Sequence, residues 1–125
     1  MRITAVIVTC NRLELLPRAL KSVSEQTRKP DYVYVVSNST DVNFLKEKEV
    51  CNELGFELFK NHRTDNYAGA LNTGIEEIVK KQGIRNNIYF ASLDDDDVWL
   101  PDYLKEITAS NTGDFDLLAA NYLRK

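Results

Sequence analysis

Residues 88–101 read IYFASLDDDDVWLP, an apolar run followed by four consecutive aspartates and a Trp-x-Pro sequence. The apolar run predicts a buried strand, and Pro101 is typical of the first turn of a helix. Four adjacent carboxylates repel one another, and a divalent cation relieves this repulsion because hard cations prefer carboxylate oxygens. The stretch therefore predicts a metal-assisted site for a phosphorylated substrate. The alternative is a solvated or disordered acidic run, which usually has polar neighbours.

The rest of the chain alternates between patterns typical of strands and of helices. Strands are predicted at residues 3–9, 32–36, 56–59, 88–93 and 116–120, and helices over about residues 11–26, 44–54 and 68–82 and after Pro101. Asn11 and Glu14 form a capping-box pattern, and Gly55 suits the residue after the second helix. About five strands and four helices predict a single α/β domain over residues 1–125, with a Rossmann-like, mostly parallel sheet.

Three polar clusters follow predicted strands. Residues 9–12 follow the first strand, residues 37–41 the second and residues 94–97 the fourth. Open α/β sheets bind their ligands at the carboxyl ends of strands, so we expect the three clusters to meet at one edge of the sheet. No Gly-x-Gly-x-x-Gly follows the first strand and no P-loop pattern occurs, which disfavours a dinucleotide fold of the usual kind and P-loop chemistry.

Composition narrows the partners and the compartment. The net charge of −3 gives no basic footprint, which argues against nucleic acid as a partner. Neither a signal peptide nor a membrane span is visible, so we expect a cytoplasmic protein or the cytosolic piece of one. Cys10 and Cys51 form no CxxC and are interpreted as small buried residues. His62 lies in a polar stretch and is expected at the surface.

Four stretches together resemble family 2 glycosyltransferases of the GT-A fold, in the order in which that family has them. They are residues 5–12 with the apolar helix that follows, residues 35–41, residues 66–75 and residues 93–101. The resemblance covers the chain from end to end. It implies a truncated GT-A-type domain that binds a nucleotide-diphosphate sugar and magnesium or manganese, and a reaction that transfers the sugar to an acceptor with inversion.

The resemblance also implies roles for individual residues. Those expected to border the base, the ribose or the end of the first strand are Thr9, Asn11, Arg12, Ser37, Asn38 and Asn66. Asp94 would face the ribose or support the site, and it is also a candidate metal ligand. Asp96 would ligate the metal. Asp95 and Asp97 receive no fixed role, although one of them is a candidate supporting residue.

Two departures from the family pattern affect the interpretation. A neutral pair, Val36-Ser37 or, if one residue is deleted, Ser37-Asn38, stands where the family often has two aspartates after the second strand, which bears on nucleotide affinity and identity. In the family a second half follows the acidic region and supplies the acceptor surface and the catalytic base. The base is therefore expected beyond Lys125, and the chain is interpreted as the nucleotide-sugar-binding half.

Two other classes of function are weighed against the enzyme. A non-catalytic nucleotide- or metal-binding module derived from the family would need no base. A phosphoryl-transfer domain would place its key aspartate at the end of the first strand, where this chain has Thr9-Cys10-Asn11, so this class is disfavoured. A half-domain would leave an exposed edge or apolar face near residues 116–122, which predicts a homo-oligomer through that region.

Overall fold

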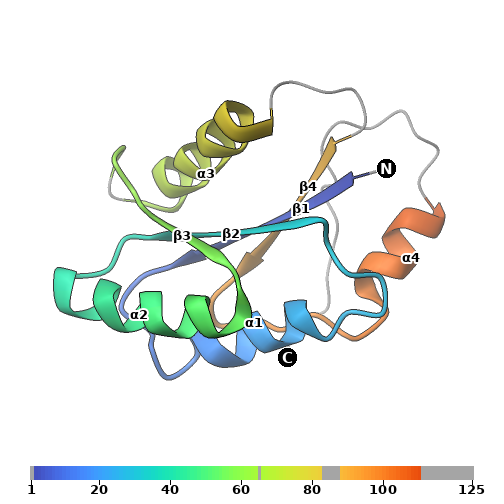
Figure 1. The fold of residues 1–125 in the computed structure, drawn as a ribbon, viewed down its shortest axis with the longest axis horizontal. Helices are drawn as coiled ribbons and strands as arrows, with labels where there is room; N and C mark the ends of the chain where they lie inside the picture. The colour runs from blue at the N-terminus through green and yellow to red at the C-terminus, as the bar shows by residue number, and fades with distance from the viewer. Residues whose placement is uncertain (1, 65, 83–87, 111–125) are drawn as a thin grey trace.

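The computed structural model describes residues 2–64, 66–82 and 88–110. In these residues strands and helices alternate along the chain (Figure 1). The elements are β1 (Arg2–Thr9), α1 (Leu16–Ser24), β2 (Tyr32–Ser37), α2 (Asp41–Leu54), β3 (Glu57–Lys60), α3 (Tyr67–Gln82), β4 (Ile88–Asp94) and α4 (Tyr103–Ser110). The fifth strand predicted at residues 116–120 and the oligomer surface predicted near it lie outside the described residues.

The four described strands form one parallel sheet in the order β3-β2-β1-β4. In the pairing of β1 with β2, Thr9 lies opposite Ser37, and in its pairing with β4, Val8 lies opposite Asp94. The carboxyl ends of these three strands therefore meet at one edge of the sheet. The Rossmann-like, mostly parallel fold predicted from the sequence is confirmed.

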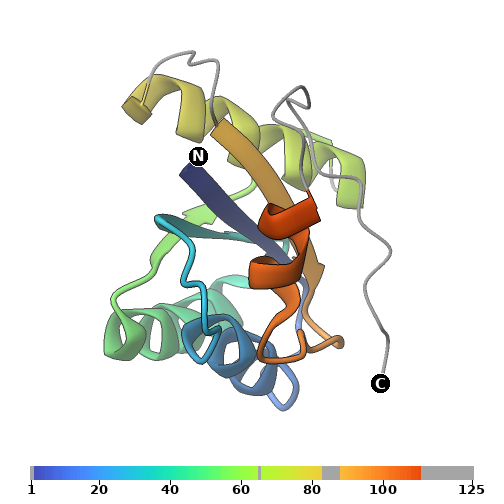
Figure 2. The same ribbon diagram turned by 90° about the vertical axis from the view of Figure 1, so that its right-hand side faces the viewer.

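Helices cover both faces of the sheet. Figures 1 and 2 show α3 on one face and α1 and α2 on the other. Side chains of β1 alternate between two cores: Ile3 and Ile7 pack in the core that contains α1 residues, whereas Val6 packs in the core that contains Ile78 of α3. A β-branched strand buried on both faces is expected for the centre of a parallel sheet. No helix in the described ranges is both long and apolar enough to cross a bilayer.

The predicted capping box at Asn11 is wrong. α1 begins at Leu16, its N-cap residue Leu15 makes no side-chain cap hydrogen bond, and Asn11 adopts the left-handed conformation with φ 52°. The Asn11 side-chain oxygen instead accepts hydrogen bonds from Thr40 N at 3.0 Å and from Asn43 Nδ2 at 2.9 Å. Contacts with a distant loop therefore replace the local cap.

The two cysteines differ in exposure, and the prediction that both are buried is wrong for one of them. Cys10 is exposed because it lies in the loop after β1, beyond the end of the strand. Cys51 is fully buried on α2, as predicted. Burial, and secondarily the nearby Glu47, raise the pKa of Cys51 to about 12. At neutral pH the Cys10 thiol is thus the accessible one.

Candidate functional site

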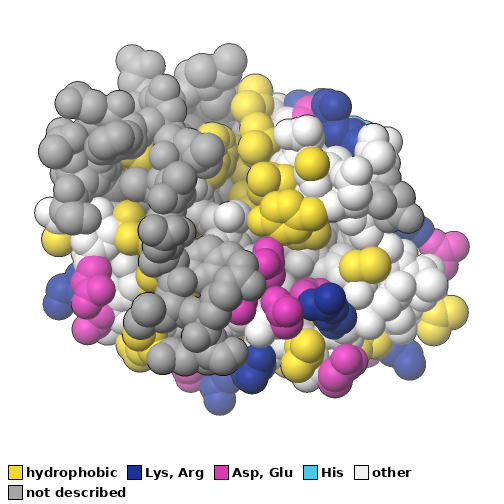
Figure 3. Space-filling view, turned by 180° about the vertical axis from the view of Figure 1, so that it is seen from behind, with side chains coloured by type: hydrophobic (Ala, Val, Ile, Leu, Met, Phe, Trp, Pro, Cys, Tyr) yellow, Lys and Arg dark blue, Asp and Glu magenta, His cyan; other side chains and the backbone are white. Residues whose placement is uncertain are grey.

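A cavity of about 400 Å³ opens at the carboxyl edge of the sheet. Six of its lining residues are among the site residues expected from the sequence: Thr9, Arg12, Asn38, Asn66, Asp94 and Asp96. Cys10, Tyr67 and Asp95 also line it. Figure 3 shows acidic side chains gathered near the middle of one face, with basic and apolar side chains beside them. The polar clusters after β1, β2 and β4 therefore meet, as expected.

The four aspartates divide into two kinds because the chain turns at the end of β4. Asp94 is the last residue of the strand, and Asp97 N donates a hydrogen bond to the Asp94 carbonyl oxygen at 3.1 Å. Asp95 and Asp97 are buried, whereas Asp94 and Asp96 are half-buried. The segment after the turn is held against α1 by buried Gln26, whose Nε2 donates to the Leu100 carbonyl oxygen at 2.7 Å.

Asp95 links the end of β1 and the loop after it to the end of β4 through hydrogen bonds. Its Oδ2 accepts hydrogen bonds from Thr9 Oγ1 at 2.9 Å and from Cys10 N at 3.1 Å. Its Oδ1 lies 3.3 Å from Arg12 Nη1. The sequence assigns Asp95 no fixed role, since four identical neighbours give no signal of which one turns inward. Its contacts are those of a supporting residue that shapes the cavity wall.

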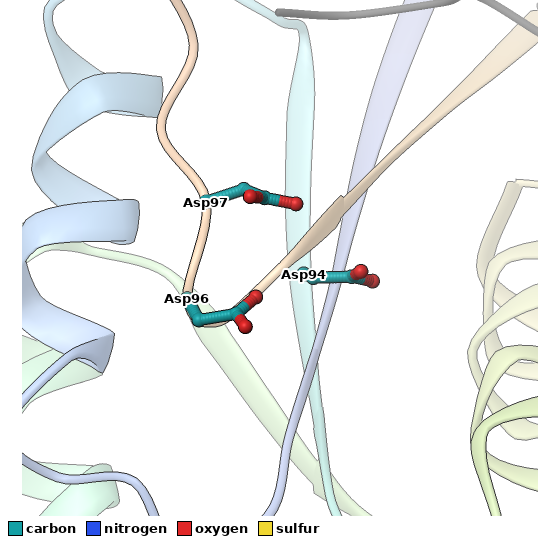
Figure 4. A group of neighbouring side chains, drawn as sticks. All are labelled: Asp94, Asp96 and Asp97. Atoms are coloured by element: carbon teal, nitrogen blue, oxygen red, sulfur yellow. The ribbon is translucent and has the colours of Figure 1, made fainter. Parts of the chain in front are cut away.

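The other three aspartates form a carboxylate group beside the cavity. One carboxylate oxygen from each of Asp94, Asp96 and Asp97 lies within 4.8 Å of the other two. Figure 4 shows these side chains leaving the end of β4 and the following turn and extending to the same side. An all-carboxylate oxygen donor set fits a hard divalent cation such as Mg²⁺ or Mn²⁺. The structure groups Asp97 with Asp94 and Asp96, the two metal ligands expected from the sequence.

Arg12 places positive charge against this acidic turn. Its Nη1 lies 3.1 Å from Asp96 Oδ2 as well as near Asp95. Attraction to Asp95, and secondarily to Asp96, raises the pKa of Arg12 above its ordinary value. The Arg12 side chain is 48% exposed, so its contribution to stability through these pairs is small. Its charge remains accessible to an anion in the cavity.

Amide side chains connect the loop after β2 to the start of α3. Asn38 Nδ2 donates to the Asn66 carbonyl oxygen at 3.1 Å, and Asn38 Oδ1 accepts from Asn61 Nδ2 at 2.6 Å. Asn66 Oδ1 in turn accepts from Gly69 N at 2.7 Å in the first turn of α3. Asn61 was not singled out in the sequence, although it directly follows β3 at the same edge as the other polar clusters.

Two residues expected in the site, Asn11 and Ser37, are not among those that line the cavity. Asn11 is exposed and bonds to the start of α2, as described above. Ser37 is fully buried, and its hydroxyl donates to Glu47 Oε1 at 2.6 Å. Both are sequence neighbours of residues that line it, and their hydrogen bonds are those of supporting residues. His62 is exposed, as predicted.

The fold and the cavity define a Rossmann-like α/β protein with an acidic cleft at the carboxyl edge of its sheet. Residues 4–120 match the model of the Glycosyl transferase family 2, and the chain belongs to this family. It is 28% identical over 116 residues to the uncharacterized glycosyltransferase YwdF of Bacillus subtilis (strain 168). This match covers 92% of the chain and 40% of YwdF, so the chain spans two fifths of that relative.

Solved structures of S. aureus TarS share the fold. The match to TarS has a TM-score of 0.56 at 21% identity and covers 87% of this chain and 19% of TarS. The match to TarS 1-349 in complex with UDP has a TM-score of 0.56 at 22% identity and covers 87% of this chain and 31% of that one. A third structure, TarS 1-349 in complex with UDP-GlcNAc, gives a TM-score of 0.56 at 20% identity and covers 87% of this chain and 30% of that one.

Proposed function

We propose that this chain is the donor-binding part of an inverting, metal-dependent glycosyltransferase that takes its sugar from a nucleotide-diphosphate sugar. The observation that carries the proposal is the cavity at the carboxyl edge of the sheet, where Asp94 and Asp96 lie beside Arg12 and two asparagine side chains. Membership of the family and the UDP and UDP-GlcNAc bound to TarS support this ligand class. The catalytic base that would deprotonate the acceptor is not assigned to any residue of the chain.

In this proposal different cavity residues contact different parts of the ligand. Asn38 and Asn66 offer amide and carbonyl groups to the base and ribose, and Thr9 holds the end of β1 in place through Asp95. Arg12 lies where its positive charge can attract the diphosphate. Asn11 and Ser37 support these residues through their bonds to Thr40 and Glu47. Asp94 contributes to both the ribose side and the metal side of the site.

The metal would be held by Asp96 and Asp94, with Asp97 as the additional carboxylate. When bound, Mg²⁺ or Mn²⁺ supplies Lewis-acid stabilisation of the diphosphate leaving group. Three adjacent carboxylates would repel a diphosphate on their own, so the charge of the chain itself makes ligand binding depend on a cation. Arg12 offsets part of this negative charge through its pair with Asp96.

The wider setting of the site is also part of the proposal. Residues 1–125 are proposed to form a single domain that works in the cytoplasm, where free thiols such as Cys10 and Cys51 stay reduced. Self-association through residues 116–122 remains the predicted oligomer contact. The second candidate, a nucleotide- or metal-binding module without catalysis, is favoured by the neutral Ser37-Asn38 pair after β2.

Calorimetric titration with nucleoside diphosphates tests the proposal. We expect one nucleotide to bind only with Mn²⁺ present, and this binding to be lost in Asp96→Asn. Asp102→Asn is the matched control, because Asp102 is exposed and does not line the cavity. Absence of binding by the wild-type chain under every condition would refute the donor site. Nucleotide binding that does not depend on Mn²⁺ would favour the non-catalytic module, which needs no Lewis acid on a leaving group.

A further inference from the structure

Glu47 is a buried carboxyl group that the proposed ligand contacts do not use. It lies on α2, its exposed fraction is 0%, and with Cys51 it is one of the two buried residues of this helix. Burial of a carboxylate among apolar residues is unfavourable unless hydrogen bonds replace its water. The partners of Glu47 therefore show what this residue does.

Two serine hydroxyls, one at the end of β2 and one in the loop that follows it, satisfy the carboxylate. Ser37 Oγ donates to Glu47 Oε1 at 2.6 Å, and Ser39 Oγ donates to Glu47 Oε2 at 2.5 Å. Each hydroxyl also accepts a backbone amide. Ser39 N donates to Ser37 Oγ at 3.0 Å, and Asn11 N donates to Ser39 Oγ at 2.7 Å. A single carboxylate thereby holds, through two hydroxyls, one amide from the loop after β2 and one from the loop after β1.

These two loops form one wall of the cavity. The loop after β1 carries Cys10 and Arg12, and the loop after β2 carries Asn38. The loops are also joined directly, since Asn38 N donates to the Thr9 carbonyl oxygen at 2.9 Å. Glu47 is not among the residues that line the cavity. It can act on a ligand only by fixing the position of residues that touch it.

We propose that Glu47 is a positioning residue for the nucleotide site, which it shapes by anchoring both loops through Ser37 and Ser39. The anchoring of the loops is independent of the proposed donor site, and only the effect of Glu47 on ligand binding rests on that proposal. The chemistry requires an acceptor-only group, because both serine hydroxyls donate toward α2. A glutamine would turn an NH₂ group toward one of them and leave that hydroxyl hydrogen without an acceptor.

Amide hydrogen exchange tests the anchoring without any ligand. In Glu47→Gln we expect exchange at the Asn11 and Ser39 amides to accelerate by about tenfold or more, while the amides of α1 keep their wild-type protection. Glu49→Gln is the matched control, because Glu49 is exposed on the same helix. Unchanged exchange at Asn11 and Ser39, or acceleration of the same size throughout the chain, would overturn the proposal.

Ser39→Ala provides a second variant if Glu47→Gln does not fold. It removes the acceptor of the Asn11 amide and leaves Ser37 bonded to Glu47. We expect faster exchange at Asn11 alone, with Ser39 N still bonded to Ser37 Oγ. Faster exchange at both amides to the same extent, or at neither, would contradict the proposed connections.

A double-mutant cycle on nucleotide affinity tests the effect on the site. We expect Glu47→Gln and Ser39→Ala each to weaken UDP binding in Mn²⁺ by about tenfold, and the double variant to bind no more weakly than either single variant. Additive losses would show that Glu47 does not act through Ser39. A wild-type chain that binds no nucleotide would remove the donor-site proposal, whereas the exchange data would still decide the anchoring role of Glu47.

Discussion

Replacement of Asp95 by asparagine tests the residue that joins the ends of β1 and β4. In Asp95→Asn the amide oxygen of the new side chain can keep the bonds from Thr9 Oγ1 and Cys10 N, but as bonds to a neutral acceptor. Hydrogen bonds to charged groups contribute about 1.5–3 kcal/mol and neutral ones about 0.5–1.5 kcal/mol, so two weakened bonds predict a loss of about 2–3 kcal/mol. The new NH₂ group also faces Arg12, whose exposed pair adds little.

Equilibrium urea unfolding followed by circular dichroism measures this loss. Asp102→Asn is the matched control, because Asp102 also accepts a hydrogen bond from a threonine hydroxyl, that of Thr27 at 2.6 Å, but at an exposed position. We expect Asp102→Asn to lower the free energy of unfolding by no more than about 0.5 kcal/mol. Equal effects of the two substitutions would refute the reasoning that burial gives Asp95 its weight.

Three further results are expected. A thiol reagent should modify Cys10 and leave folded Cys51 unmodified, and a nucleoside diphosphate with Mn²⁺ at about ten times its Kd should slow this reaction about tenfold; an unchanged rate would contradict occupancy of the cavity. In the folded state the pKa of Cys51 is raised from 9.0 to about 12. The stabilisation linked to this shift is complete below pH 9 and is lost as the pH rises toward 12, because over this range only the unfolded thiol ionises. Between pH 9 and pH 12 the free energy of unfolding, measured in urea, should fall by about 1.4 kcal/mol per pH unit less in Cys51→Ala than in the wild type. Equal slopes in the two proteins would contradict the raised pKa. Gly74→Ala should lower the thermal unfolding midpoint with a net loss of about 1 kcal/mol, since its Cβ would approach Val6 Cγ1 to 3.0 Å and Val36 Cγ2 to 3.1 Å and this overpacking exceeds the gain in helix propensity; a more stable variant would show that the sheet yields.

The sequence predicts the strands and their common edge because both signals are local. Apolar runs indicate the strands, and the polar residues that follow them indicate where a parallel sheet would bind a ligand. Thr9, Asn38 and Asp94 are found at that edge for this reason. The same logic applied to the residue after β3 would have found Asn61.

Residues whose roles depend on distant contacts could not be assigned from the sequence. Asn11 satisfies a local capping pattern, but its side chain bonds to residues near 40, and these contacts replace the cap. Among four identical aspartates, only the approach of β1 to β4 makes Asp95 the one that bonds to Thr9. Glu47 lies on the inner side of a helix whose only other buried residue is Cys51, and its partners come from the preceding strand and loop.

Because β4 pairs with β1, the site can form only late in the synthesis of the chain. Thr9 and Asp95, which bond to each other across this pair, are 86 residues apart in the chain. β1 and β2 can pair while the chain is still short, whereas the acidic turn joins them only after residues 88–97 have emerged and closed a long loop. If the proposed donor site binds a nucleotide, a nascent chain gains this affinity only once β4 has docked, and the bound ligand favours the docked state over the open one.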